Sequence, residues 1–236
     1  MMDISKNGLQ AVRSRIADAC LLSHRNARDI ILVAVSKSVP AEALRGVHMV
    51  GQSDFGESYV REALAKMAAL ADLPLIWHYI GPIQSNKTRA IAENFDWAHS
   101  VDRLKIAERL SQQRPHSKDP LNLCIQVNIS GEASKSGVAP AEVPALAQAV
   151  ARLPQVRLRG LMAIPEPTED RDLSRRRFES LARLHAALQA NRLPLDTLSM
   201  GMSDDLETAI AAGSTLLRVG TAIFGDRPLS SSNNNI

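Results

Sequence analysis

The stretch Ile30-Ile-Leu-Val-Ala-Val-Ser-Lys37 is an apolar run that closes on a lysine. Short apolar runs rich in β-branched residues are typical of buried strands in parallel sheets. Before this run, Leu9, Val12 and Ile16 recur at helical spacing, which predicts an amphipathic helix over residues 4–23. The run is therefore interpreted as the first strand of a chain in which helices and strands alternate.

Seven further strand-like segments follow the first one, at residues 53–55, 75–80, 97–101, 121–129, 158–164, 197–202 and 216–224. Helices are expected between them, at residues 40–44, 57–70, 85–94, from an N-cap at Asp102, and at 140–153, 173–190 and 204–212. Strands that alternate with helices pair in parallel through right-handed crossovers, and eight such units are typical of a TIM barrel.

The predicted fold class is therefore α/β, with a single (βα)8 TIM barrel over residues 1–229 that includes the extra N-terminal helix. The alternative is an open doubly wound sheet. That layout usually presents a Gly-x-Gly-x-x-Gly turn after its first strand, and none follows residues 30–37 here. Residues 230–236, Ser-Ser-Ser-Asn-Asn-Asn-Ile, are expected to form a disordered polar tail.

The composition argues against several classes of function. A net charge of +3 and only 3% aromatic residues predict no nucleic-acid binding. Cys20 and Cys124 are too few for a disulfide scaffold or a zinc motif, so a reduced, cytoplasmic location is expected. His78 and His99 are interpreted as isolated histidines without acids beside them in the fold, so they are expected to be core or hydrogen-bonding residues, and no metal site is predicted. Residues 1–10 lack an apolar signal segment, and no membrane span or membrane association is expected.

The end of the chain carries small residues suited to a phosphate group. In a TIM barrel, the loops after strands seven and eight form the recurrent phosphate site, because backbone N–H groups and a helix N-terminus converge there. Gly201 and Gly220 would allow close approach of the backbone, and Ser203 and Thr221 would donate hydroxyl hydrogen bonds. These residues would share the carboxyl-terminal face of the barrel with Lys37.

Lys37 is in phase with Val33 and Val35, so its stem would leave an apolar barrel interior. Desolvation would lower the pKa of its amine, and a neutral amine condenses with an aldehyde to form a Schiff base. Arg218 lies two residues before Gly220, where its guanidinium could face a pyridine nitrogen and keep it unprotonated. One reactive amine and one phosphate cradle indicate pyridoxal phosphate.

Simpler explanations of the same residues stay open on local sequence alone. A lysine after an apolar strand is often a solvated loop charge, which applies to Lys37. Gly201 and Gly220 could serve turns or packing, and Arg218 could be an ordinary ion-pair partner.

A set of motifs runs nearly from end to end of the chain: Ala34-Val-Ser-Lys37, Phe55-Gly-Glu57, Tyr59-Val60, Trp77-His78, Ile80-Gly-Pro82, Gln84-Ser-Asn-Lys87, Gln126-Val-Asn128, Ser134-Lys-Ser-Gly137, Arg159-Gly-Leu-Met-Ala-Ile-Pro165, Gly201-Met-Ser-Asp204 and Arg218 to Gly225. As a set they resemble the YggS/PROSC family of pyridoxal phosphate homeostasis proteins. The fold of that family is similar to the N-terminal barrel domain of alanine racemase, the type III fold of pyridoxal phosphate enzymes. The resemblance implies this barrel without the C-terminal β domain.

The resemblance also implies roles for individual residues. Lys37 would carry pyridoxal 5′-phosphate as a Schiff base. Ser203, Gly220 and Thr221 would hold the phosphate, and Arg218 would address the pyridine nitrogen.

Two further positions are implied to contact the cofactor. Met162 would line the ring pocket. The family usually reads Gly-Glu-Asn-Tyr where this chain has Gly56-Glu-Ser-Tyr59, so any cofactor contact at Ser58 would be made by a shorter side chain.

Three functional hypotheses follow from these residues and the resemblance. In the favoured one, the protein buffers pyridoxal phosphate and delivers it to apoenzymes that depend on it, which affects amino-acid and keto-acid metabolism. It would have no dedicated turnover and would be a monomer, because the second domain that completes the racemase site and dimer is missing. The alternatives are a weak amino-acid racemase, with a second base from Tyr59, Tyr79 or His78, and a Schiff-base aldolase whose lysine attacks a phosphorylated substrate directly.

Overall fold

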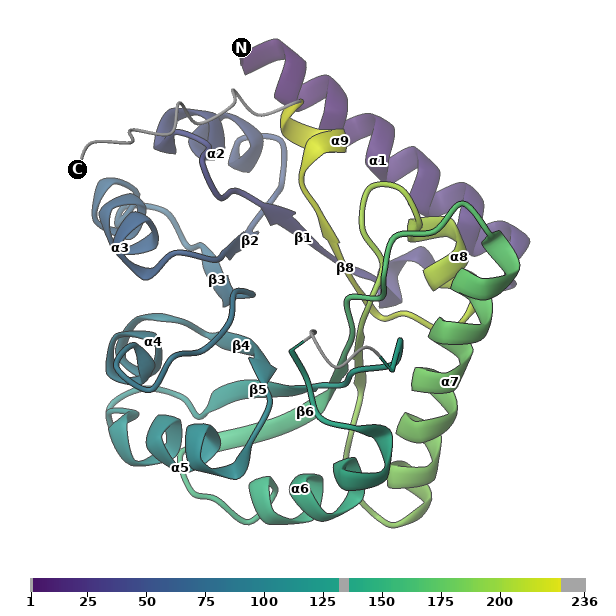
Figure 1. Ribbon diagram of the computed structural model, residues 1–236. Helices are drawn as coiled ribbons and strands as arrows, with labels where there is room; N and C mark the ends of the chain where they lie inside the picture. Colours follow the sequence, from purple (N-terminus) through teal and green to yellow (C-terminus); the bar gives the residue numbers. More distant parts are fainter. Residues whose placement is uncertain (1, 132–135, 226–236) are drawn as a thin grey trace, which may run out of the picture.

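Eight parallel strands close into a barrel in the computed structural model, which describes residues 2–131 and 136–225 (Figure 1). The strands are β1 (Ile31–Val35), β2 (Asp54–Glu57), β3 (Ile76–Tyr79), β4 (Trp97–Val101), β5 (Leu121–Gln126), β6 (Val156–Met162), β7 (Thr197–Ser199) and β8 (Leu216–Val219). Each strand pairs with the next, and β8 returns to β1 with Val33 opposite Arg218. The predicted TIM barrel is confirmed, and the open sheet is wrong.

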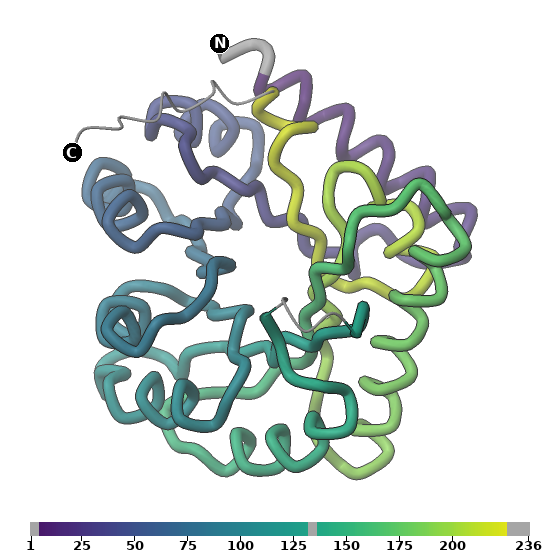
Figure 2. The backbone as a smooth tube through the Cα atoms, in the orientation of Figure 1, coloured from purple at the N-terminus to yellow at the C-terminus, as the bar shows by residue number. Residues whose placement is uncertain are grey.

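Helices surround the barrel, as the tube in Figure 2 also shows. They are α1 (Met2–Leu22), α2 (Ala41–His48), α3 (Val60–Ala69), α4 (Thr88–Asn94), α5 (Leu104–Gln113), α6 (Val143–Val150), α7 (Arg171–Ala190), α8 (Leu206–Ala211) and α9 (Thr221–Phe224), with 3₁₀ turns at Ala27–Asp29 and Pro140–Glu142. The predicted polar tail at residues 230–236 lies outside the described part of the chain. Within the described part, none of these helices is both long enough and apolar enough to cross a membrane.

The first helix, α1, lies outside the barrel and packs against α2, α8 and α9 (Figure 1). Its apolar stripe is buried as predicted, with Leu9, Val12 and Ile16 in the core. Gly8 allows the close approach of α9, because a Cβ at that position would overlap the backbone oxygens of Ala222 and Ile223. The extra helix thus supports the last turn of the chain, which follows β8.

Several predicted boundaries are wrong, and three of them lie where a strand ends. The strand expected over residues 216–224 ends at Val219, because Gly220 leaves the extended conformation (φ −118°, ψ −75°) and the chain continues as α9. The strand expected over residues 197–202 ends at Ser199. The predicted N-cap at Asp102 is also wrong, since α5 begins at Leu104 and the Asp102 carboxylate accepts a hydrogen bond from its neighbour Arg103 at 2.8 Å.

The barrel interior is more polar than the sequence pattern of the first strand predicts. Val33 and Val35 are buried there, as expected. The large apolar core instead lies between the barrel and the helices, where Phe55, Ile91, Phe95, Ile106, Leu123, Phe178 and Leu217 pack. The interior residues of several strands are polar and fully or almost fully buried: His78, His99, Ser199 and Arg218. Buried polar groups require hydrogen-bond partners, so these side chains form a network.

Candidate functional site

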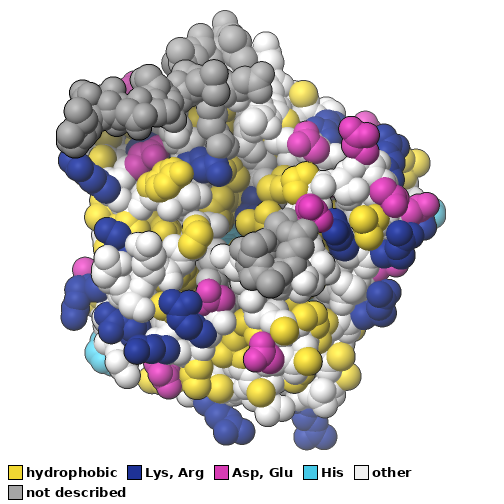
Figure 3. Space-filling model, in the orientation of Figure 1, with side chains coloured by type: hydrophobic (Ala, Val, Ile, Leu, Met, Phe, Trp, Pro, Cys, Tyr) yellow, Lys and Arg dark blue, Asp and Glu magenta, His cyan; other side chains and the backbone are white. Residues whose placement is uncertain are grey.

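A cavity of about 210 Å³ lies at the carboxyl-terminal ends of the strands. It is lined by Val35, Lys37, Ser58, Ile80, Ile164, Met202, Ser203, Asp204, Arg218, Gly220 and Thr221. Figure 3 shows a hollow near the centre of the face seen in Figure 1. Six of the seven residues predicted to contact a cofactor share this cavity.

The seventh residue, Met162, does not line the cavity. It is fully buried in a small cluster with Trp97 and Cys124. Burial raises the pKa of the Cys124 thiol to about 12, so this thiol stays protonated at neutral pH. The cluster is a packing unit of the barrel interior.

Lys37 lies in the turn after β1, and the backbone on both sides of it is held by side chains of α3. Lys66 Nζ donates a hydrogen bond to the carbonyl oxygen of Ser36 at 2.6 Å. The N–H of Ser38 donates to Glu62 Oε1 at 2.5 Å, and Ser38 adopts a left-handed conformation with φ +64°. These contacts fix the turn from which the Lys37 side chain enters the cavity.

The same support includes a buried carboxylate. Glu57 Oε1 lies 2.7 Å from Lys66 Nζ and accepts a hydrogen bond from Ser36 Oγ at 2.5 Å, and the Glu57 side chain is 0% exposed. Burial raises the pKa of Glu57, and the hydrogen bonds from Lys66 and Ser36 oppose that effect. This cluster was not predicted from the sequence, although the motifs Phe55-Gly-Glu57 and Ala34-Val-Ser-Lys37 contain Glu57 and Ser36.

Ser203 and Thr221 form the polar wall of the cavity. Thr221 Oγ1 donates to Ser203 Oγ at 3.0 Å, and the N–H of Ala222 donates to the same oxygen at 3.3 Å. Arg15 of α1 donates to the carbonyl oxygen of Ser203 at 2.9 Å, which ties this loop to the first helix. Gly220 occupies the N-cap of α9 between these groups. Two hydroxyls converge here as the sequence predicts, but the helix that begins beside them is α9, where a strand was expected.

Gly201 is a turn and packing glycine, which decides one of the open alternatives. Its φ is +100°, and a Cβ there would lie 2.6 Å from Ala209 Cβ and 2.7 Å from Leu217 Cδ2. It allows the loop after β7 to pack against α8 and β8, and it does not line the cavity. The following turn is closed by Asp205 Oδ1, which accepts from the N–H of Met202 at 2.6 Å.

Arg218 is a buried cation, 3% exposed, at the floor of the same cavity. Its Nη1 donates to Ser199 Oγ at 2.5 Å, and its Nη2 donates to the carbonyl oxygen of Ala163 at 2.9 Å. Burial lowers its pKa to about 10, so the guanidinium stays charged at neutral pH. Among the described residues it forms no ion pair within 4.0 Å, which removes support for an ordinary ion-pair role.

Two histidines connect Arg218 to an acid. His99 Nδ1 lies 2.8 Å from Ser199 Oγ, and His99 Nε2 lies 3.0 Å from His78 Nδ1. His78 Nε2 lies 3.0 Å from Asp54 Oδ1. The expectation of hydrogen-bonding histidines is correct, but the premise that no acid lies near them is wrong. In the part of the chain that the structure describes, no group of three or more His, Cys, Asp or Glu side chains is arranged to hold a metal ion.

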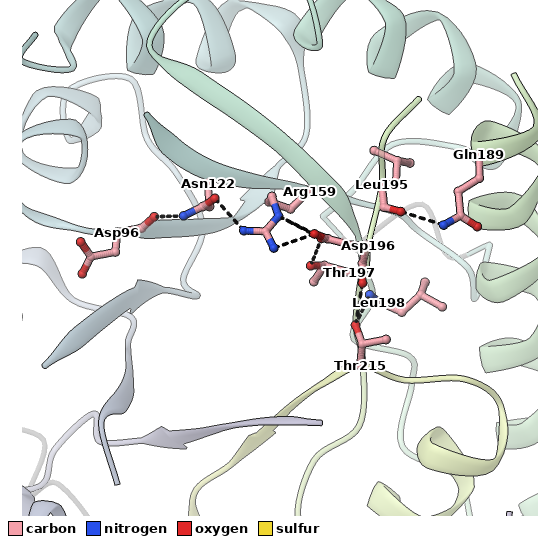
Figure 4. A network of polar contacts seen from close by, with 9 residues as sticks. All are labelled: Asp96, Asn122, Arg159, Gln189, Leu195, Asp196, Thr197, Leu198 and Thr215. Carbon is pink, nitrogen blue, oxygen red and sulfur yellow. Dashed lines mark hydrogen bonds and ion pairs between the residues drawn. The ribbon is translucent and has the colours of Figure 1, made fainter. Parts of the chain in front are cut away.

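A second polar network lies toward the amino-terminal ends of β5 to β7 (Figure 4). Arg159 makes a two-point contact with Asp196, its Nη2 lying 2.7 Å from Asp196 Oδ2. Its Nη1 donates to Asn122 Oδ1 at 3.0 Å, and its guanidinium carbon lies 4.8 Å from the centre of the Trp97 ring. This arginine pairs with a half-exposed carboxylate far along the strands from Lys37, and it does not line the cavity.

Residues 9–228 match the protein family described as alanine racemase, N-terminal domain. A pyridoxal phosphate homeostasis protein of Pseudomonas aeruginosa is 60% identical over 227 residues, which cover 96% of this chain and 97% of the relative. The chain belongs to this family. A pyridoxal phosphate homeostasis protein of Escherichia coli K12 is 51% identical over 236 residues, covering 98% of this chain and 99% of the relative. The family resemblance found in the sequence motifs is confirmed.

Solved structures agree with the barrel of this family member. PipY of Synechococcus elongatus, with PLP bound, is 41% identical, with a TM-score of 0.79 and coverage of 89% of this chain and 100% of PipY. Alanine racemase from Corynebacterium glutamicum has a TM-score of 0.71 over 98% of this chain and 63% of the racemase. At 16% identity the racemase supports the fold alone.

Proposed function

We propose that this protein binds pyridoxal 5′-phosphate in the cavity around Lys37 and serves the homeostasis of that cofactor. It buffers the cofactor and delivers it to apoenzymes, with effects on amino-acid and keto-acid metabolism. The observation that carries the proposal is the meeting of Lys37, the Ser203–Thr221 hydroxyl pair and the buried Arg218 in one cavity of about 210 Å³. The names of the two curated relatives and the PLP-bound PipY structure support it.

The chemistry of these side chains fits the cofactor. When bound, pyridoxal phosphate supplies an aldehyde and a ring that accepts electrons. The Lys37 amine would hold the cofactor through its aldehyde, and Ser203, Gly220 and Thr221 would hold the phosphate. Arg218 would place its permanent charge by the pyridine nitrogen, which would keep a proton off that nitrogen and weaken the ring as an electron acceptor. Ser58 lines the cavity, and its side chain is shorter than the asparagine that the family usually has at this position.

Met162 is left out of the proposed contact set. Its side chain packs with Trp97 and Cys124, and the residues that line the cavity do not include it. Met162 is the last residue of β6, and its side chain packs in the barrel interior. It lies two residues before Ile164, which does line the cavity.

A role without dedicated turnover is favoured by the positions of the candidate bases. A racemase needs a second acid–base group close to the reacting carbon. The Tyr79 hydroxyl donates to the carbonyl oxygens of Ser58 and Pro82, and burial raises its pKa. His78 is bound to Asp54, and neither of these candidates lines the cavity.

The third candidate base, Tyr59, is 61% exposed and also lies outside the cavity lining. The cavity therefore combines a reactive amine with anion-binding groups, and none of the three candidate bases lines it. That combination suits storage and release of a cofactor. We further propose that the barrel acts as a monomer in the cytoplasm.

The absorbance spectrum of the purified protein between about 300 and 500 nm, before and after borohydride reduction, tests cofactor binding. A yellow band that reduction removes, with the cofactor then found on the Lys37 peptide, is the expected result. Lys37→Ala should lack the band, whereas Lys87→Ala, which changes a lysine outside the cavity, should keep it. A colourless parent that also fails to take up added pyridoxal phosphate would reject the proposal in favour of the aldolase hypothesis.

Delivery is tested by mixing the loaded protein with an apoenzyme that depends on pyridoxal phosphate. The apoenzyme should regain activity even when a scavenger of free pyridoxal phosphate is present. Recovery abolished by the scavenger would reject direct delivery and leave buffering alone. Turnover with a panel of amino acids at rates typical of enzymes, on the order of 1 s⁻¹ or faster, would favour the racemase alternative.

A further inference from the structure

The histidine chain joins the two ends of the barrel. Arg218 lines the cavity at the carboxyl-terminal ends of the strands. At the other end of the chain, the Asp54 side chain is 23% exposed and lines a second cavity of about 480 Å³ beside the first residues of β1 and β2. His78, His99 and Ser199 connect these two residues inside the barrel through an unbroken series of contacts between 2.5 and 3.0 Å. One line of hydrogen bonds therefore connects the Lys37 cavity with the opposite end of the molecule.

Donor and acceptor rules fix the proton on each atom of this line. A guanidinium only donates, so Ser199 Oγ accepts from Arg218 and keeps its own proton to donate. The other contact of this hydroxyl is His99 Nδ1, which must then be the bare nitrogen. His99 therefore carries its proton on Nε2 and donates it to His78 Nδ1. His78 in turn carries its proton on Nε2 and donates it to the Asp54 carboxylate.

The opposite direction does not satisfy the same atoms. If His99 donated from Nδ1, Ser199 Oγ would receive two hydrogen bonds, and its own proton would need a third partner. The described residues supply none, since the contacts of Ser199 Oγ are Arg218 Nη1 and His99 Nδ1. Burial also lowers the pKa of His99 well below its usual value, with His78 and Arg218 as further causes, so this ring does not hold a second proton at neutral pH.

We propose that Asp54, His78, His99 and Ser199 form a one-way hydrogen-bond relay in which every donor points from Arg218 toward Asp54. The relay makes Ser199 and the two histidines positioning residues for the Arg218 guanidinium. The cation at one end and the carboxylate at the other polarise each bond in the same sense, which strengthens the line as a whole. Loss of the charge at Asp54 should therefore weaken the polarisation of the hydrogen bonds made by His99 and Arg218, which Asp54 does not contact.

The ring nitrogens of the full-length protein, without added cofactor, test the relay directly. In ¹H–¹⁵N spectra of the imidazoles, both His78 and His99 should carry their proton on Nε2 at pH 7. A proton on Nδ1 of either ring would overturn the assignment. This measurement is independent of the proposed function, because it needs no pyridoxal phosphate.

Asp54→Asn tests transmission along the line. The amide oxygen can still accept from His78, so the tautomers should stay the same while the negative charge is lost. The ¹⁵N resonances of His99 should then shift together with those of His78. The control Asp72→Asn removes a carboxylate that pairs with Arg45 on the surface, and it should move neither ring. A change confined to His78 would reject transmission.

Ser199→Ala tests the line from its other end and also covers the case in which Asp54→Asn fails to fold. It should shift His99 and, through it, His78, and it should leave the buried His185 of α7 unchanged. The consequence for the cofactor rests on the proposed function: in the loaded protein, Ser199→Ala should move the absorbance maximum, because Arg218 loses its 2.5 Å anchor. Ser111→Ala, at a buried serine that donates to the Pro154 carbonyl, should not. Unshifted histidines, or equal spectra of the two loaded serine variants, would reject the positioning role.

Discussion

Lys66 Nζ lies 2.6 Å from the carbonyl oxygen of Ser36, the residue that precedes Lys37. A buried ammonium on α3 therefore holds the backbone of the residue next to the proposed cofactor lysine. The same ammonium is 2.7 Å from Glu57 Oε1 and 2.6 Å from Glu62 Oε1, and the Lys66 side chain is only 7% exposed. One cation thus joins β2, α3 and the turn after β1.

Lys66→Met should destabilise the protein by about 3–5 kcal/mol, because it leaves the Glu57 carboxylate buried without its cation. Urea unfolding followed by circular dichroism measures the loss. Arg45→Met breaks the exposed pair with Asp72, and this matched control should cost much less stability, because solvent screens exposed pairs. Adding Glu57→Gln to Lys66→Met should recover part of the loss. Equal stability of the two single variants would contradict a structural role for the buried cation.

The acid side of the stability profile should depend on His185. Burial lowers the pKa of this histidine below its ordinary value of 6.5. Just below pH 6.5, the unfolded state therefore binds a proton more readily than the folded state does. Stability is therefore lost as the pH falls below 6.5. The Nε2 atom of His185 is buried without a hydrogen-bond partner, so His185→Leu should keep most of the stability at pH 7.

The measurement is the free energy of unfolding at several pH values between about 5 and 8, in the range where histidine titrates. The free energy of unfolding of His185→Leu, relative to that of the parent, should rise as the pH falls. His116→Leu is a suitable control because His116 is an exposed histidine that contacts Gln155 at the protein surface. Parallel profiles for the parent and His185→Leu would show that His185 does not titrate with folding.

The barrel and most of the cavity could be predicted from the sequence because both depend on local patterns. Apolar runs alternate with helical periods, and parallel strands bring their carboxyl ends to one face, so Lys37, Ser203, Arg218 and Thr221 meet there. The extension of the last strand through residue 224 was wrong because the apolar run continues past Gly220 into a helix. A short apolar run does not distinguish strand from helix.

The relay could not be predicted because it depends on contacts between distant positions. Ser199 lies 100 residues from His99, and His78 lies 24 residues from Asp54. Strand alternation indicates which face a side chain takes, but a register shift between β4 and β5 changes which residues lie level with each other. Contact between His99 and Ser199 therefore follows from the barrel geometry and not from spacing in the sequence.

Gly201→Ala should destabilise the protein by about 1–3 kcal/mol more than Gly213→Ala. The two glycines have nearly the same φ values, +100° and +102°, so the backbone strain imposed on an alanine should be similar at both positions. A Cβ at Gly201 would meet Ala209 Cβ at 2.6 Å, whereas the nearest atom at Gly213 is Leu198 Cδ1 at 3.9 Å. The difference in thermal unfolding between the two variants isolates the packing of the loop that carries Ser203. Equal destabilisation would show that the conformation alone, and not close packing, requires glycine at position 201.

Ser58→Asn should slow the release of pyridoxal phosphate. Ser58 lines the cavity, and the longer amide can add one hydrogen bond, worth about 1 kcal/mol, to the bound cofactor. That energy corresponds to about fivefold slower release. The rate is measured by mixing the loaded protein with an excess of an apoenzyme that captures free cofactor. Ser117→Asn, in an exposed loop before β5, is the matched control and should release at the parent rate. Equal rates for Ser58→Asn and the parent would mean that position 58 makes no contact that limits release, and Ser58 would be removed from the proposed cofactor contacts.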